Sequence, residues 1–167
     1  SLAAAREMEA VVFKSHVTIT ADRAWLARKH VAGVKVFGGV TLNRAVGGLN
    51  PQAVEWMWRM QGGYGRVVGF PTFDADNHVR HAGTAPSGIG VVDEGGEVLP
   101  VVRDILRICA AQQLVVHTGH ALQRMQRTHA LDARVVQCGA NLVDQPLRFA
   151  DELAEAVRIA QDALEDL

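Results

Sequence analysis

The chain has 167 residues, of which 49% belong to the hydrophobic set and 21% are charged, proportions that are typical of a globular protein and exclude a disordered chain. Its 17 basic and 18 acidic side chains form no long blocks and give a formal net charge of -1, so we expect neither nucleic acid nor a membrane surface as a partner. Two cysteines are too few for a disulfide framework. Because Ser1 to Met8 lack the layout of a secretion signal, we expect a cytoplasmic protein.

Short apolar runs alternate with helix-like stretches from the amino end onward. Residues 10–14 (AVVFK) predict a strand, and residues 20–30 predict a helix that Thr20 would cap. Residues 34–42 predict the next strand, in which the Gly38-Gly39 pair indicates a bulge or a close backbone approach. Asn50-Pro51 then predicts a helix start, because Asn caps a helix and Pro fits its first position.

The same alternation continues to the carboxyl end. The remaining expected elements are a strand over 66–70, a long loop over 72–97 that is a lid candidate, a helix from Pro100, strands over 114–118 and 134–138, and a helix from Asp151. Alternation of this kind predicts an α/β fold with a parallel sheet, because parallel neighbours need a crossover connection. An open doubly wound sheet and a (βα)8 barrel both satisfy it, and both gather ligands at the carboxyl ends of their strands.

Polar side chains follow each of the first four expected strands. They are Lys14 and His16 after the first strand, Asn43 and Arg44 after the second, Thr72 and Asp74 after the third with Asn77 and His78 close behind, and His120 after the fourth. Because the carboxyl ends of parallel strands meet at one edge, we expect these side chains to share a site.

Imidazole and carboxylate groups are the ligands that zinc and related divalent ions prefer. We therefore expect His16 and His120 to bind a divalent metal, zinc or alternatively manganese or iron. Lys14 would be a further ligand, if carbamylated, or an electrostatic partner. A metal-bound water loses its proton near neutral pH, and Asp74 is the expected general base.

Each of these residues has a structural alternative. A single histidine after a strand is commonly a hydrogen-bonded loop residue, and His78 and His81 have solvated positions on a loop as their alternative. Strand alternation places His117 on the opposite side from Thr118, so we leave it out of the expected site. The Gly47-Gly48 pair either brings helix amides to a phosphate or forms a tight turn.

Five segments carry a family resemblance. They are KSH (14–16), GGVTLNRAVGGLNPQAVE (38–55), PTFDADNH (71–78), VVDEGGEVLP (91–100) and TGH (118–120). Over about residues 1–120 the chain resembles a bacterial family of uncharacterised amidohydrolase-related proteins. The resemblance implies a TIM-barrel-like fold, here a single (βα)n domain over 1–167, and a metal-dependent hydrolase. By position it implies Lys14, His16 and His120 as ligands, with Asn43, Thr72, Asp74 and His78 lining the pocket, to which we add Arg44 and Asn77 as substrate-binding residues.

The chain departs from that family's pattern in two places. Family members begin with an Asp-x-His-x-His strand, which does not precede Ala10, and Gln137-Cys138 occupies the nearest strand to an expected Thr-His pair. A full barrel also needs about 200 residues or more. We therefore expect segments to be missing before Ser1, near His120-Ala121 and near Ala160-Gln161.

Two functions follow from these observations. The first is a metal-dependent hydrolase that acts on an amide, cyclic amide or ester bond of a small polar molecule. The second is a barrel that binds a small anion or metabolite without turnover. We also expect a homodimer, because an open sheet leaves an edge and a face that a partner should cover.

Overall fold

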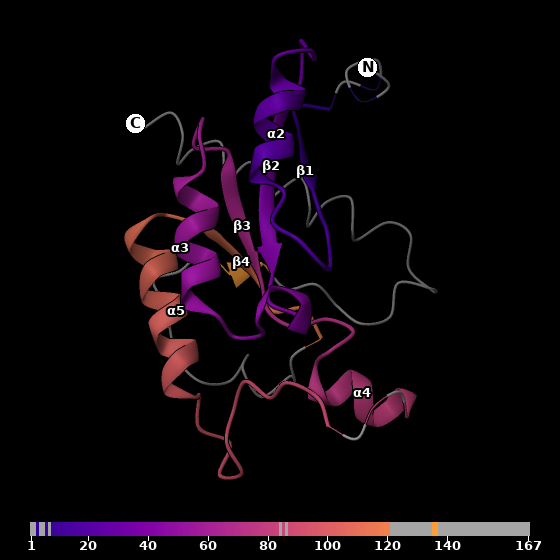
Figure 1. Cartoon of the computed structure of the whole chain (residues 1–167), viewed down its shortest axis with the longest axis vertical. Coiled ribbons are helices and arrows are strands. Elements are labelled where there is room, and N and C mark those ends of the chain that lie inside the picture. The colour runs from indigo at the N-terminus through magenta and orange to yellow at the C-terminus, as the bar shows by residue number, and fades with distance from the viewer. Residues whose placement is uncertain are drawn as a thin grey trace.

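A computed structural model gives the fold of the chain, and it describes residues 3, 6, 8–83, 85, 87–120 and 135–136. Strands and helices alternate along the chain (Figure 1). The elements are β1 (Ala10–Phe13), α2 (Ala21–Arg28), β2 (Lys35–Thr41), the 3-10 helix η1 (Arg44–Val46), α3 (Pro51–Arg59), β3 (Gly65–Gly69), α4 (Asp76–Ala82), α5 (Pro100–Ala111), β4 (Val115–His117) and β5 (Val135–Val136).

The strands form one parallel sheet. Its order is β1-β2-β3-β4-β5, so each strand pairs with its neighbour in the sequence and the order does not reverse across the described sheet. The predicted α/β fold with a parallel sheet is confirmed, and so is the bulge, because the register of β2 and β3 shifts between Gly38 and Gly39. Within the part of the chain that the structure describes, the strands form a sheet and not a closed barrel.

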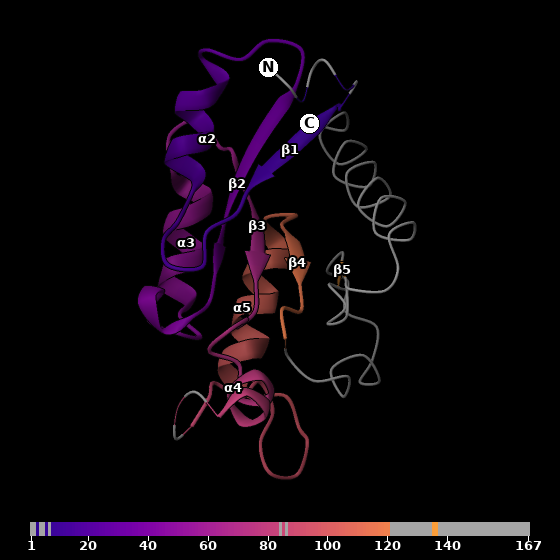
Figure 2. The same ribbon diagram turned by 90° about the vertical axis from the view of Figure 1, so that its right-hand side faces the viewer.

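Helices cover one face of this sheet (Figure 2). Val54 and Met57 of α3 and Ile105 of α5 are fully buried, and they pack in one apolar cluster with Val68 of β3 and Val116 of β4. Parallel crossovers are right-handed, so a strand order without reversal places successive helices on the same side. The hydrophobic core of the described residues therefore lies between the sheet and the helices.

The helices α3 and α2 begin in different ways. The Asn50 side chain accepts a hydrogen bond from the Gln52 amide at 3.0 Å and Pro51 is the first helical residue, which confirms the predicted helix start. Thr20 precedes α2, but its hydroxyl makes no capping bond. Instead it donates to the Phe13 carbonyl at 2.7 Å and joins β1 to α2.

The segment between β3 and α5 differs from the prediction. Residues 72–97 were expected to form a long loop, but they contain α4, a parallel bridge between Ala75 and Ile89, and an antiparallel bridge between Val92 and Val98. The Ile89 amide donates to the Asp74 carbonyl at 2.7 Å, so tertiary hydrogen bonds order a stretch with little sequence periodicity.

Several expectations fall where the structure makes no test. The helix expected from Asp151 and the joints at His120-Ala121 and Ala160-Gln161 lie outside the described residues. Among the described helices, none has the length and apolar character required to span a bilayer. Val12 and Phe13 on the end strand β1 are 40% and 38% exposed, and the homodimer stays a prediction.

Candidate functional site at the carboxyl ends of the strands

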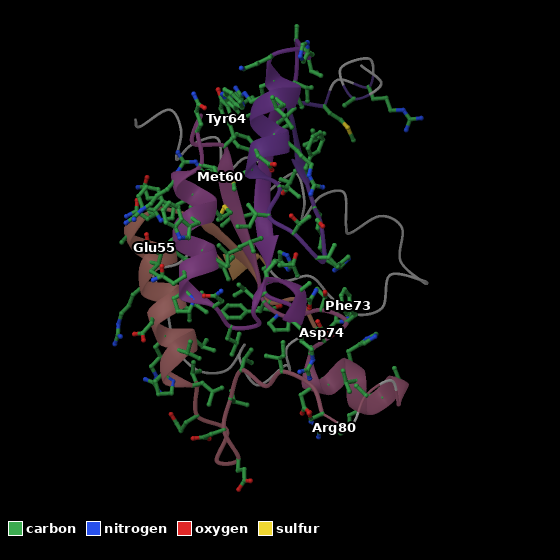
Figure 3. All side chains as sticks on the ribbon, in the orientation of Figure 1. Glu55, Met60, Tyr64, Phe73, Asp74 and Arg80 are labelled. Carbon is green, nitrogen blue, oxygen red and sulfur yellow. The ribbon has the colours of Figure 1, made fainter. Side chains whose placement is uncertain are left out.

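The carboxyl ends of β1 to β4 converge on a polar region. Figure 3 shows Phe73 and Asp74 at this end of the sheet, near η1, while Tyr64 marks the opposite end. The residues that the sequence predicted here come from three strand ends: His16 follows β1, Asn43 follows β2 and Thr72 follows β3. Hydrogen bonds join these three residues directly, as the strand-end argument predicts.

Asn43 holds the centre of that network. Its side chain is fully buried, its Oδ1 accepts from the Thr72 amide at 2.9 Å, and its Nδ2 donates to the His16 carbonyl at 3.1 Å and to Thr72 Oγ1 at 2.9 Å. A buried amide with these partners fixes the backbone after three strands at once. Asn43 therefore positions the strand ends from within the fold, and its predicted role in substrate binding stays a prediction.

Thr72 orients the His16 ring through a hydrogen bond. Its Oγ1 lies 2.8 Å from His16 Nδ1, which leaves Nε2 as the ring nitrogen that Thr72 does not engage. Burial, and then the charge of Lys14, lower the pKa of His16 below its ordinary value of 6.5. A neutral imidazole with one oriented nitrogen is able to bind a metal ion or accept a proton.

His117 joins the site although strand alternation excluded it. Its ring lies against Gly69 of β3, where any side chain would overlap it, and the Gly119 amide donates to its Nδ1 at 3.3 Å. Burial lowers its pKa to about 4, with further contributions from the charges of Lys14, His16 and His120. The sequence signal for this residue is the glycine that β3 places beside it in register.

His120 lies past β4 and faces α4. Its amide donates to the Pro71 carbonyl at 2.9 Å, and its ring centroid is 5.0 Å from that of His78 in α4. Burial lowers its pKa, and so do the charges of His78, Lys14 and His16, against an opposing hydrogen bond to the Thr72 backbone. We call Lys14, His16, His78, His117 and His120 the histidine–lysine cluster.

Asp74 and Arg44 form a separate contact beside the cluster. Asp74 Oδ2 accepts from the Arg44 amide at 2.8 Å, and its Oδ1 lies 3.9 Å from Arg44 Nε. The Arg44 guanidinium also donates to the Ser87 carbonyl at 2.6 Å. Asn77 lies in the first turn of α4, where its carbonyl is 2.7 Å from His81 Nδ1. The structure thus places Asp74 and Arg44 against each other.

Comparison with known sequences assigns the chain to a family. The sequence model of a "Family of unknown function (DUF6282)" matches residues 1–163. The chain belongs to this family. No curated protein and no solved structure matches the chain. Because the DUF6282 description carries no activity, the function of this protein has to be argued from the chemistry of its site.

The fit of a metal ion to this DUF6282 protein was tested on its own donor groups. Among residues 8–83, 85 and 87–120, no group of three or more His, Cys, Asp or Glu side chains is arranged to hold an ion. The ring centroids of His78 and His120 lie 5.0 Å apart. A catalytic zinc site uses three protein ligands, so these residues do not complete a metal site by themselves.

Proposed function

We propose that this DUF6282 protein is a hydrolase of the amidohydrolase-like type that acts on a small polar molecule at the histidine–lysine cluster. One observation carries the proposal: the ends of β1 and β4, together with α4, bring four imidazoles and one ammonium group to a common region. Catalytic groups in parallel α/β folds gather at the carboxyl ends of the strands, where this cluster lies.

The winding of the sheet supports an amidohydrolase-like architecture. A doubly wound sheet reverses its strand order at a switch point, whereas a (βα)8 barrel adds strands in one direction. The described sheet runs from β1 to β5 without reversal. We therefore infer that its five strands are part of a TIM-barrel-like arrangement, which extends the resemblance found in the sequence.

The residues of this chain supply acid–base and electrostatic chemistry. His16 and His120 have lowered pKa values and are neutral at pH 7, so a ring nitrogen of either residue is able to take a proton from an attacking water. The Lys14 ammonium would stabilise the negative charge that develops on the oxygen of the bond under attack. The predicted role of Asp74 as general base stays a prediction, since Arg44 engages its carboxylate.

The proposal includes a divalent ion that the protein would bind, but assigns it no step of the reaction. Zinc, or alternatively manganese or iron, would lower the pKa of a bound water, and His16 and His120 are the residues that would hold it. Because the described residues do not complete a coordination shell, we assign no step of the reaction to the ion.

Hydrolysis of simple reporter substrates tests the proposal. The purified protein is assayed on p-nitrophenyl acetate and p-nitroacetanilide at pH 7.5, before and after dialysis against zinc. We expect activity that falls about 100-fold in His120→Ala, the lower range for loss of an acid–base group. The matched control is His30→Ala, which removes an exposed imidazole next to α2 and should leave activity unchanged. Equal hydrolysis by wild type and His120→Ala would refute the proposal.

A further inference from the structure

The histidine–lysine cluster gathers ionisable groups of one kind. The groups that act on His120 are His78, Lys14 and His16, and those that act on His117 are Lys14, His16 and His120. All of these groups are basic. The carboxylate of Asp74 contacts the amide and the guanidinium of Arg44.

Six basic side chains elsewhere in the described structure have acidic or aromatic partners. Four arginines pair with carboxylates close to them in the sequence: Arg59 with Glu55, Arg80 with Asp76, Arg103 with Glu97 and Arg107 with Asp104. Arg28 and Lys29 lie over aromatic rings. The cluster differs from all of them because its basic groups are close to one another, which is unfavourable once more than one is protonated.

The geometry of the cluster fits a small oxyanion. His78 and His120 lie with ring centroids 5.0 Å apart, within reach of two oxygens of one carboxylate or phosphate group. His16 is held by Thr72 through Nδ1 and therefore keeps Nε2 for a ligand. Lys14 is exposed, and its ammonium is the one permanent charge among the five groups.

We propose that the ligand of this site carries an anionic group, a carboxylate or a phosphate, that binds at the histidine–lysine cluster with Lys14 as its counter-ion. The inference rests on the proposed function only in taking the cluster as the substrate site; it does not require hydrolysis. The anion supplies the negative charge that the described residues do not place beside the imidazoles.

Titration of the histidine ring signals by NMR tests this inference on the full chain. Sodium sulfate stands for the phosphate class and sodium succinate for the carboxylate class, and sodium chloride at equal ionic strength corrects for screening. We expect saturable shifts of the His16, His78 and His120 ring signals with sulfate or succinate, and none for His30. The more tightly bound of the two anions identifies the class.

Two variants separate specific binding from general charge effects. Lys14→Met should weaken the tighter anion at least about tenfold, because it removes a charge-assisted contact. Arg80→Met removes the same charge from an exposed site on α4 and should leave the affinity within twofold. Equal affinities in wild type and Lys14→Met, or no saturable shift in wild type, would overturn the inference. Circular dichroism verifies that both variants are folded.

The two proposals fail in different ways. If the anion binds through Lys14 and no reporter is hydrolysed, the hydrolase proposal fails and the anion site stands as a binding site without turnover. If His120→Ala abolishes hydrolysis while neither anion binds or inhibits, the anion inference fails and the hydrolase proposal stands.

Discussion

Basic side chains have different neighbours at the two ends of the parallel sheet. At the amino end, Arg28 Cζ lies 4.2 Å from the centre of the Tyr64 ring and 5.7 Å from that of Phe37, and Lys29 Nζ lies 3.6 Å from that of Trp25. Cations over aromatic faces stabilise a fold. At the carboxyl end, imidazoles lie near Lys14 and near one another, and the pKa values of His16, His117 and His120 are lowered. One end of the sheet therefore contributes stability, and the other gathers the basic groups of the proposed ligand site.

The largest expected effect that separates the two ends is the pH dependence of stability. His117 titrates near 6.5 in the unfolded chain and at about 4 in the folded protein, so the unfolded chain binds the proton first as the pH falls. The stability is complete above pH 6.5 and decreases between pH 6.5 and 4, by about 3 kcal/mol from this residue. Lys14, His16 and His120 face His117 and contribute to the shift. Urea denaturation of the chelator-treated protein at pH 7.5, 5.5 and 4 measures it.

A substitution isolates this contribution. His117→Asn keeps a neutral polar side chain over Gly69 and removes the titration, so its loss of stability between pH 7.5 and 4 should be smaller by about 3 kcal/mol. The carboxylates titrate alike in both proteins and cancel in the difference. The same pH slope in both proteins would show that His117 does not carry the effect.

The next effect concerns the buried amide at the carboxyl end. Asn43→Ala removes hydrogen bonds to His16 and Thr72 and leaves the buried Thr72 amide without its partner. We expect a loss of about 3 kcal/mol in the free energy of unfolding, measured by urea denaturation at pH 7.5. The control is Asn50→Ala, which removes one helix cap and should cost about 1 kcal/mol. Equal losses would contradict a central role for Asn43.

The smallest effect comes from the amino end. Arg28→Ala removes the contacts with the Tyr64 and Phe37 rings and should lower the free energy of unfolding by about 1 kcal/mol. Because the loss lies at the opposite end of the sheet, hydrolysis and anion binding should not change. A fall in anion affinity with Arg28→Ala would break the proposed division between the two ends.

The sequence predicted much of the fold, because the elements concerned are locally encoded. Asn50 and Pro51 specify a helix start, and the Gly38-Gly39 pair marks the bulge between β2 and β3. The helix α4 was not predictable in this way, because hydrogen bonds from the distant Ile89 order the chain around Asp74 and Asp76.

The candidate site was predicted in part for the same physical reason. His16, Asn43 and Thr72 lie together as expected, because neighbouring parallel strands end at the same edge of the sheet. His117 was missed, since its place depends on the absence of a side chain at Gly69 in the neighbouring strand. The pairing of Asp74 with Arg44 was also missed, because two separate loops position it.

The most direct test of the account is a pH titration of the histidine ring signals by NMR in wild type and Lys14→Gln. The charge of Lys14 helps to lower the pKa values of His16, His117 and His120. Removing this charge should therefore raise the pKa of each of these three residues. His30, at the far end of α2, serves as the internal reference. If the three pKa values are the same in both proteins, Lys14 and the imidazoles do not share a site, and both the proposed hydrolase and the anion site are wrong.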